Sequence, residues 1–436
     1  MLLNFSVENW MSFRDFSTFS MIGSRERQHN ERVPRVNKYS SKVLPVAAIY
    51  GGNASGKTCF FKALQFVRDL VITNTQPESL IKVVPYKLDK SCQEKPTQFV
   101  VEMLIDECIW ELTMSLNRHK VLSEKLTKIT SSTETLMYER NADGSFYFSP
   151  SVLQKPPLMY AADGTRDNQL FLSNSVMQKI DEFKPIWAWF RSLALISPSS
   201  VFTDHSIFTA SLAGSKSVRE VIGELDTGIW GIEEVDVPIE NIPESLRNLF
   251  VDKLQKSQSL IMGGPNGERY RLIVDGDNIR IKKTVTYHQG SDGSNVRFEL
   301  HQESDGSLRL LDLVPAFLAI SIKQAKGVVV IDELDRSLHS MMSMQLISSY
   351  LSTCSKESRA QLIFTTHDLY LMDQSLLRRD EMWVTERRKD GCSSIGAFSD
   401  FKEVRYDKDI RKSYLQGRMG GVPKLRFADN CHQGDE

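Results

Sequence analysis

The feature that most constrains this sequence is a glycine-rich segment at residues 51–58, which fits the pattern G-x-x-x-x-G-K-[ST]. It follows a short apolar run, residues 43–50, whose valine, alanine and isoleucine content predicts a buried central strand. After Lys57 the apolar residues recur at helical spacing, so the glycines join a strand to an amphipathic helix. An accidental glycine-rich turn is the weaker interpretation in this setting. The segment therefore predicts a phosphate-binding loop.

A loop of this kind holds phosphate through backbone N–H groups and through the positive end of the helix that follows. Lys57 is predicted to reach the β and γ phosphate oxygens and to assist catalysis, while the Thr58 hydroxyl completes the shell of a Mg²⁺ ion. The expected cofactors are therefore ATP and Mg²⁺. The predicted nucleotide-binding residues of the loop are Gly51, Asn53, Ala54, Ser55, Gly56, Lys57 and Thr58.

A second apolar strand, residues 328–331, ends in the two carboxylates Asp332 and Glu333. Because the phosphate loop is present, Asp332 is predicted to hold Mg²⁺, directly or through water. Glu333 is predicted to point past the metal toward an attacking water and to act as the general base. The alternative is that Glu333 only caps the next element.

A third apolar strand, residues 361–366, ends in His367. A lone histidine at a strand end is usually structural, but this one follows both the phosphate loop and the acidic pair. It stands where ABC-type ATPases carry their switch histidine. His367 is therefore predicted to be catalytic, by hydrogen bonding to the γ-phosphate and orienting the water.

Residues 303–307 precede a stretch with helical spacing, residues 308–322, so Ser304 and Gly306 lie at a predicted helix N-terminus that can bind an anion. The bare sequence departs from the usual LSGG wording and would also suit an ordinary helix cap. In ABC-type architecture this helix end completes the nucleotide site of a second molecule. We therefore expect a head-to-tail homodimer or higher oligomer, with Asp335 in the loop that lines its seam.

The fold class expected from these patterns is α/β, an ABC-type P-loop ATPase head with an antiparallel β-lobe and a helical insertion. We expect an N-terminal ATPase lobe with the phosphate loop and a β-rich subdomain at residues 1–165, a mainly helical insertion at 166–260, and a C-terminal ATPase lobe at 261–436. Turn signals at residues 141–144 and 275–278 predict two β-hairpins.

The composition argues against several classes of protein. Lysine and arginine number 54 against 55 aspartate and glutamate, so there is no global polycation of the kind that clamps nucleic acid. No apolar run approaches the roughly 20 residues that span a bilayer, and the first residues do not read as a signal peptide. These features predict a cytoplasmic protein without a membrane partner. The six cysteines form no CxxC pair, which argues against a zinc site and a disulfide framework.

Taken together, these motifs resemble those of bacterial single-protein ATPases of the overcoming-lysogenization-defect and abortive-infection type, relatives of SMC and double-strand-break-repair heads. The resemblance also rests on residues 7–13 and on the tail segment 414–423, so it covers nearly the whole length. It implies ATP-driven dimerisation or higher assembly, and often a role in defence against phage or other foreign DNA. It further implies a sensor that holds a separate toxic effector, with a phage protein or DNA as a trigger.

The sequence departs from this group in one respect. The residues after His367 show no second acidic strand set of the kind a Toprim nuclease needs, so nuclease activity is expected in a separate, Toprim-like protein. There is also no long heptad segment for a coiled-coil arm of SMC length. The pattern does not fix the glutamine of the Q-loop, for which Gln169 is a candidate.

Two other function classes stay open beside the defence switch. A DNA-repair-type ATPase acting without a toxic effector fits the same motifs, whereas a transport-type ATPase fits less well because of the β-rich insertion after the phosphate loop. A scaffold that binds ATP without turnover is disfavoured, because a simple binder needs neither Glu333 nor His367.

Overall fold

The computed structural model of the 436-residue chain describes residues 1–198, 216–225, 227–242, 259–275, 278–401, 410–419 and 421. It divides into two compact units. Unit 1 is formed by Met1–Arg191 together with Ile363–Glu436, and unit 2 by Ser192–Leu362. Unit 1 is thus built from two separate stretches of the chain, with unit 2 inserted between them. The domain boundaries expected near residues 165 and 260 stay predictions.

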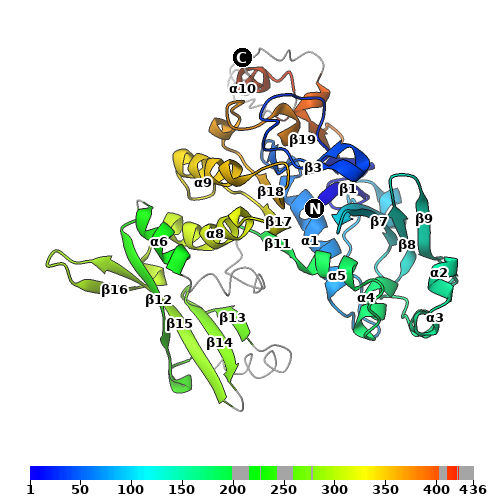
Figure 1. Ribbon diagram of the computed structural model, residues 1–436, viewed down its shortest axis with the longest axis horizontal. Coiled ribbons are helices and arrows are strands. Elements are labelled where there is room, and N and C mark those ends of the chain that lie inside the picture. Colours follow the sequence, from blue (N-terminus) through cyan, green and yellow to red (C-terminus); the bar gives the residue numbers. More distant parts are fainter. Residues whose placement is uncertain are drawn as a thin grey trace, which may run out of the picture. The chain divides into compact units, whose positions relative to one another are not determined.

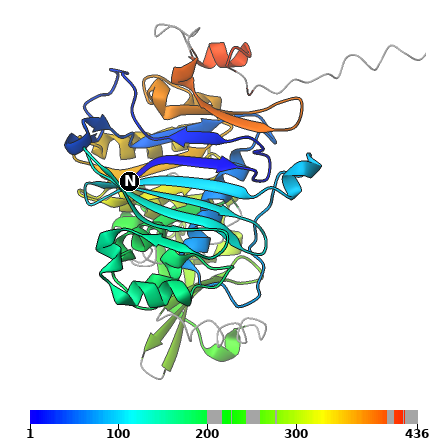
Figure 2. The ribbon, with the colours of Figure 1, turned by 90° about the vertical axis from the view of Figure 1, so that its right-hand side faces the viewer.

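The larger sheet of unit 1 is antiparallel, with the strand order β10-β9-β8-β7-β6-β1-β2 (Figure 2). Its strands are β1 (Leu2–Glu8), β2 (Ser17–Ser20), β6 (Thr97–Ile105), β7 (Cys108–Leu116), β8 (Val121–Ile129), β9 (Glu134–Arg140) and β10 (Phe146–Phe148). The first two strands, β1 and β2, pair antiparallel. The hairpin expected at residues 141–144 is confirmed: it joins β9 to β10, and the Gly144 N–H donates to the Asn141 carbonyl at 3.0 Å.

Four short helices lie beside this sheet in unit 1, with α2–α4 near β9 and β10 (Figures 1 and 2). They are α2 (Pro150–Leu153), α3 (Pro156–Asp163), α4 (Phe171–Met177) and α5 (Lys184–Arg191). The buried carboxylate of Glu124 on β8 accepts the N–H groups of Phe171 and Leu172 at 2.6 and 2.9 Å. Burial raises the pKa of Glu124, but these bonds and that of the Tyr138 hydroxyl satisfy its oxygens.

A second group of strands in unit 1 leads into the glycine-rich loop. The fully buried β5 (Val46–Tyr50) pairs in parallel with β19 (Met382–Arg387), which pairs antiparallel with β20 (Ser393–Ala397). The helix α1 (Lys57–Ile72) packs on the large sheet through its aromatic residues, and the Phe60 ring lies 5.6 Å from that of Phe5 on β1. Unit 1 also contains the short strand pair β3 (Arg35–Val36) and β4 (Ser41–Lys42) and the helix α10 (Ile410–Leu415).

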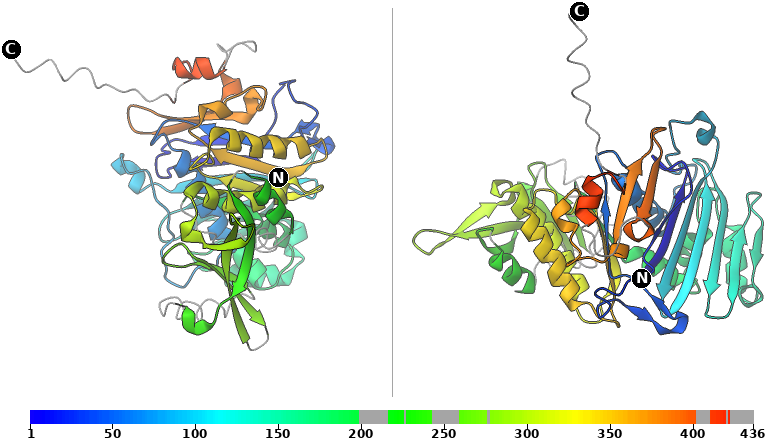
Figure 3. Two further views of the ribbon diagram at one scale, coloured as in Figure 1. Left: turned by 90° about the vertical axis from the view of Figure 1, so that its left-hand side faces the viewer. Right: turned by 90° about the horizontal axis from the view of Figure 1, so that it is seen from above.

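Unit 2 contains the parallel pair β11 (Leu193–Ile196) and β17 (Lys326–Ile331), whose residues after Lys326 are buried. Two helices, α8 (Asp305–Ser321) and α9 (Ser340–Thr353), pack against each other, and α8 also packs on β17 (Figure 3). The strand β18 (Arg359–Thr365) carries the chain from unit 2 into unit 1. The apolar strands expected before the acidic pair and before His367 are thus confirmed.

The rest of unit 2 is a sheet with the order β12-β15-β14-β13 and with β16 paired to β15. The strands are β12 (Ile229–Asp236), β13 (Ser259–Gly263), β14 (Arg269–Asp275), β15 (Asn278–Gln289) and β16 (Asn295–Glu299), and α6 (Lys216–Glu224) packs on β12. Asp275 pairs with Asn278 as the expected hairpin requires, although residues 276–277 lie outside the described part.

The stretch 166–260, expected to be mainly helical, is mixed in its described part. It contains α4, α5 and α6 but also the strands β11, β12 and the start of β13. The strand β12 is held by the long strand β15, which is distant in sequence, and this partner is not visible in the local pattern of residues 229–236.

In the part of the chain that the structure describes, no helix combines the length and the apolar character needed to cross a bilayer.

Candidate functional site

The glycine-rich loop connects β5, which ends at Tyr50, to α1, which begins at Lys57, as the sequence predicts. Gly56 precedes the helix with φ +117°, a conformation that side-chain-bearing residues rarely adopt. A Cβ at this position would also lie 2.6 Å from Ser393 Oγ. The loop therefore fits against the start of β20 only because this residue is glycine.

The strand β19, which pairs with β20, also contacts the loop. Ser55 is buried, and its hydroxyl lies 2.6 Å from the Thr385 hydroxyl on β19. Asn53 and Ala54, at the tip of the loop, are exposed. The loop is thus fixed through Ser55 while its tip and the first N–H groups of α1 form a cradle without bulky side chains. This arrangement fits a phosphate group.

Lys57 and His367 are brought together by the fold. The Lys57 ammonium is buried and donates to the carbonyl oxygens of Gly51 and Gly52 at 2.7 and 3.1 Å. It also lies 3.4 Å from Nδ1 of His367, a residue 310 positions later in the chain. The histidine follows directly after β18, and the Thr366 N–H donates to the carbonyl of Ile49 in β5 at 3.0 Å. Both residues belong to unit 1.

The acidic pair follows β17 in unit 2. Asp332 is buried, with an exposed fraction of 1%, and Glu333 is half-buried. The backbone of Glu333 has φ +50°, in the left-handed region that costs energy for any residue except glycine. Backbone strain of this kind is typical of functional sites, where the surrounding structure holds a side chain in one required direction.

An arginine that the motif analysis did not single out holds this strained turn. Arg309 lies in α8, and its guanidinium donates to the carbonyl oxygens of Asp332 and Glu333 at 3.0 and 2.9 Å and to that of Ser197 at 3.3 Å. Burial lowers the pKa of Arg309. The available sequence signal was an arginine between two leucines in a mostly apolar helix, and the structure shows that this side chain is buried.

The predicted anion-binding helix end is present. Ser304 is the N-cap of α8, and its hydroxyl accepts the N–H of Ser307 at 3.1 Å. Gly306 faces the turn after the acidic pair, because a Cβ there would lie 2.8 Å from the carbonyl oxygen of Ser337. Asp335 belongs to the same turn and is half-buried. The start of α8 and residues 333–339 are therefore in contact within unit 2.

The sequence predicts a Mg²⁺ ion with Thr58 and Asp332 as ligands, and the structure shows which side chains could bind a metal. Among the described residues, no group of three or more histidine, cysteine or acidic side chains could hold a metal ion. Mg²⁺ in nucleotide sites is commonly bound by one or two protein oxygens and by the phosphates themselves. The hydroxyl of Thr58, in the first turn of α1, and the carboxylate of Asp332 are ligands of this kind. Their roles stay predictions.

Gln169, the candidate for the Q-loop glutamine, lies just before α4 and makes hydrogen bonds within unit 1. Its side chain is buried, and its amide nitrogen donates to Asn74 Oδ1 at 2.8 Å, while its backbone carbonyl accepts from Arg140 at 2.8 Å. These contacts join the segment before α4 to the loop after α1. They account for the amide nitrogen and the backbone carbonyl of Gln169, and the Q-loop assignment gains no support from them.

Residues 7–13, which contribute to the family resemblance, comprise the end of β1 and the turn after it. The Trp10 indole N–H donates to the carbonyl of Cys59 in α1 at 3.0 Å. The Asn9 amide bonds to three backbone carbonyls, among them that of Cys92 at 2.8 Å, and its oxygen accepts the Tyr86 N–H at 3.0 Å. This turn therefore anchors the first turns of the helix that follows the glycine-rich loop.

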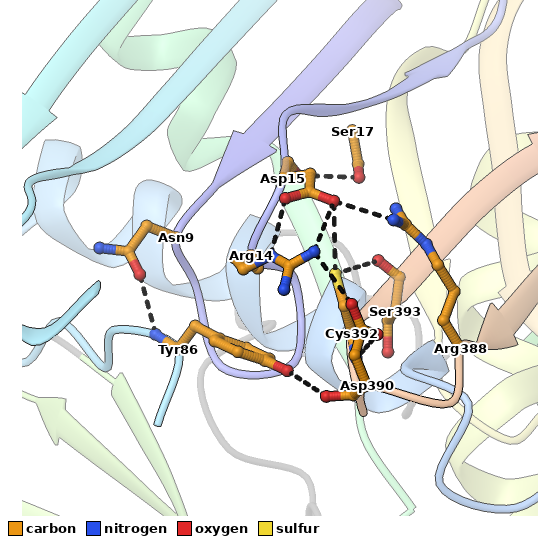
Figure 4. Close-up of polar contacts among 9 residues, drawn as sticks. All are labelled: Asn9, Arg14, Asp15, Ser17, Tyr86, Arg388, Asp390, Cys392 and Ser393. Carbon is orange, nitrogen blue, oxygen red and sulfur yellow. Dashed lines mark hydrogen bonds and ion pairs between the residues drawn. The ribbon is translucent and has the colours of Figure 1, made fainter. Parts of the chain in front are cut away.

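A network of alternating charges joins this turn to the hairpin between β19 and β20 (Figure 4). Asp15 pairs with Arg14 at 2.9 Å and with Arg388 at 3.0 Å, and Arg14 pairs with Asp390 at 3.0 Å. The Arg14 guanidinium holds the pKa of Asp15 below its usual range. The Ser393 N–H donates to the Ser12 carbonyl at 2.7 Å. The network thus fixes the two segments that lie against Gly56.

Comparison with known proteins gives one family and a fold similarity. Residues 46–373, most of the chain, match the family described as AAA domain, putative AbiEii toxin, Type IV TA system. This match spans the glycine-rich loop, the acidic pair and His367. No curated relative matches the chain.

Among solved structures, the chain is similar to the SMC head domain from Thermotoga maritima, with 14% identity, a TM-score of 0.36 and coverage of 91% of this chain and 98% of that one. It is also similar to an SMC head bound to the C-winged helix domain of ScpA, with 14% identity, a TM-score of 0.41 and coverage of 91% and 97%. The family match and the strand–loop–helix geometry confirm the expected α/β P-loop fold. The chain belongs to the family of AAA domains described as putative AbiEii toxin, Type IV TA system, and is a P-loop ATPase of the AAA class.

Proposed function

We propose that this ATPase is a switch that binds ATP, assembles around it and hydrolyses it. The observation that carries the proposal is the 3.4 Å approach of Lys57 Nζ to His367 Nδ1. The sequence assigns both residues to the γ-phosphate from two motifs far apart in the chain. A γ-phosphate site requires both side chains close together beside a loop whose backbone the phosphate can approach, and Gly56 gives the loop such a position.

The proposed chemistry gives each residue one task. ATP supplies the phosphoanhydride bond and, with Mg²⁺, the charge that the site neutralises. Lys57 exchanges its bonds to the carbonyls of Gly51 and Gly52 for phosphate oxygens. Thr58 and Asp332 offer oxygen ligands to the metal. Glu333 takes the proton of the attacking water, and its strained backbone keeps the carboxylate in one direction.

The proposed assembly is a head-to-tail homodimer or a higher oligomer. Ser304 caps α8, so the N–H groups of that helix end can meet an anion. In ABC-type architecture this end completes the site of a second copy, with Gly306 and Asp335 at the seam. The close approach of Gly306 to the Ser337 carbonyl supports this proposal, since it places the start of α8 beside the turn that contains Asp335.

The biological role that we propose is the sensor ATPase of an anti-phage defence system in the cytoplasm. It would control a separate effector, such as a Toprim-like nuclease or another toxin, and respond to a phage protein or to DNA. Support comes from the resemblance to abortive-infection ATPases and from the family description, which names a toxin–antitoxin system.

Purification of the tagged chain from its native operon, followed by mass spectrometry, tests this role. The Glu333→Gln variant, which should keep ATP bound, is compared with the wild type, and the operon with an inactivated effector gene serves as a control. We expect a toxic companion protein to copurify and to depart when ATP is hydrolysed. Copurification with a permease, or with repair proteins and no toxin, would contradict the defence role.

A further inference from the structure

The tail segment that contains α10 lies against the glycine-rich loop. The Gly52 N–H donates to the carbonyl oxygen of Gly421 at 2.9 Å, and the Tyr414 hydroxyl donates to the same oxygen at 2.9 Å. No motif of the sequence analysis assigns a task to these tail residues. All of them belong to unit 1, so the contact lies within one compact unit.

The tail is held in place by packing as well as by these two hydrogen bonds. Ile410, Tyr414 and Met419 are buried, with exposed fractions of 1%, 4% and 0%. The Tyr414 ring lies 6.1 Å from that of Phe398, which stacks at 5.9 Å on Tyr50, the last residue of β5. Burial raises the pKa of the Tyr414 hydroxyl, so this group stays protonated and donates at neutral pH.

Gly421 is required at its position for two reasons. Its backbone has φ +74°, which strains any residue with a side chain, and a Cβ would lie 2.6 Å from Val384 Cγ2 on β19. The carbonyl of Gly421 can therefore reach the loop only while the residue is glycine.

The hydrogen bond acts on one particular peptide group. In a trans peptide the N–H and the C=O point in opposite directions and move together as one plane. The plane between Gly51 and Gly52 donates its N–H to Gly421 on one side, and on the other its carbonyl accepts from the Lys57 ammonium at 2.7 Å. The tail thus fixes the orientation of the peptide group to which the lysine is bound.

We propose that Gly421, supported by Tyr414, is a positioning residue of the nucleotide site. It holds the Gly51–Gly52 peptide in the orientation from which Lys57 can turn to the phosphates. Without this contact the peptide keeps only its bond to Lys57, the loop samples more shapes, and binding must select the competent one. The inference rests on the proposed ATP site and adds to it a part of the chain far from the binding motifs.

The test compares full-length variants that differ only in this contact. Gly421→Ala introduces the strained Cβ and its contact with Val384. Gly417→Ala is the matched control, because Gly417 has a similar φ of +71° in the same tail but nothing within 4 Å of its Cβ position. Tyr414→Phe removes one donor to Gly421 and adds no atom. ATP affinity, KM, kcat, the unfolding temperature and hydrogen exchange of peptides covering residues 51–56 are measured for each.

For Gly421→Ala we expect the Kd and KM for ATP to rise about tenfold, the cost of one hydrogen bond, while kcat at saturation changes little. Hydrogen exchange of residues 51–56 should be faster before nucleotide is added. Tyr414→Phe should show the same changes to a smaller extent, and Gly417→Ala should bind and exchange as the wild type does. A tail that only stabilises the fold would lower the unfolding temperature without separating KM from kcat.

A folded Gly421→Ala protein with wild-type affinity and exchange would overturn the tail proposal while leaving the ATP site intact. If this variant does not fold, the outcome depends on Tyr414→Phe, and unchanged exchange and affinity in that variant overturn the proposal. Failure of the wild type to bind ATP would instead remove the proposed function itself.

Discussion

Arg309, near the N-terminus of α8, donates a 2.9 Å hydrogen bond to the backbone carbonyl of Glu333, the proposed general base. The helix that carries Arg309 is the one whose first residue is capped by Ser304. One guanidinium thus joins this helix to the turn that carries the proposed base. We expect this contact to hold the Glu333 backbone in place during hydrolysis.

Replacing Arg309 tests this linkage. Arg309→Lys keeps the charge but loses the planar guanidinium, whose Nη2 donates to the carbonyls of Asp332 and Glu333 while Nη1 donates to that of Ser197. We therefore expect kcat to fall about ten- to hundredfold with ATP affinity nearly unchanged. Arg269→Lys is the matched control, because Arg269 is another buried arginine of unit 2, paired with Asp312 at 2.8 Å. Equal losses of kcat in the two variants would show a general effect of removing a buried arginine.

Removal of the loop lysine should abolish binding. Lys57→Ala takes away the cation that meets the phosphate oxygens, while the apolar face of α1 is untouched. Lys62→Ala is the control, since Lys62 lies on the same helix and is exposed. Titration with a fluorescent ATP analogue measures both. Unchanged affinity in a folded Lys57→Ala protein would remove the phosphate-site assignment.

The general base is tested by a change that keeps the shape of the side chain. Glu333→Gln should bind ATP but turn it over at least a hundredfold more slowly, because an amide cannot accept the proton of the water. Size-exclusion chromatography with ATP and Mg²⁺ should then show a trapped assembly. Glu357→Gln, in an exposed turn before β18, is the control. Near-normal turnover in Glu333→Gln would move the base elsewhere, with His367 as the next candidate.

Shared sites are tested by mixing two inactive proteins. Ser304→Asp keeps a side chain that caps helices well but places a negative charge where the γ-phosphate is proposed to arrive. Gly306 is less suitable, since any side chain there meets the Ser337 carbonyl within its own chain. A mixture of Ser304→Asp with Lys57→Ala should regain part of the ATPase rate, because one of the two sites in the mixed dimer carries neither defect.

Two controls accompany the mixing experiment. Ser304→Asn, a neutral cap of similar quality, should retain much more activity than Ser304→Asp. Normal hydrolysis by Ser304→Asp alone would exclude a phosphate contact at this helix end, and the head-to-tail arrangement would lose its main support.

A buried ion pair in unit 1 gives a prediction for pH. Burial raises the pKa of Glu381 to about 7, although Arg32 lies 2.6 Å away. A carboxyl whose pKa is raised by folding binds more protons in the folded state, so stability falls as the pH rises from about 4.5 to about 7.

Across this range the free energy of unfolding should fall by about 3 kcal/mol, and above about pH 7 it should no longer depend on Glu381. Thermal unfolding between pH 4.5 and 8 should show this slope in the wild type and lose it in Glu381→Gln. An identical slope in both proteins would mean that another group titrates.

The sequence predicts what is local and strongly patterned. The strand–loop–helix unit around residues 51–58, the strand before Asp332 and the capped helix at Ser304 all depend on neighbours within a few residues, and each is present. The strand β12 was not foreseen, because it depends on the distant strand β15.

The residues that support the site could not be predicted from the sequence for a similar reason. Arg309, Ser393 and Gly421 act through backbone groups of other segments. Every residue has a backbone carbonyl, and every residue except proline has a backbone N–H. A contact to such a group therefore does not require a particular residue type at the contacted position. In the sequence, Arg309 is marked only by its charge in a mostly apolar helix, and Gly421 only by its place in the tail segment 414–423.

The division of unit 1 between residues 1–191 and 363–436 has a consequence for protein synthesis. The ribosome makes the glycine-rich loop before His367 and Gly421, which contact it, and His367 follows Lys57 by 310 positions. A nascent chain that stops before these residues carries the loop without the contacts. We therefore expect ATP binding, and any assembly that depends on it, to begin only after both stretches of unit 1 have been made.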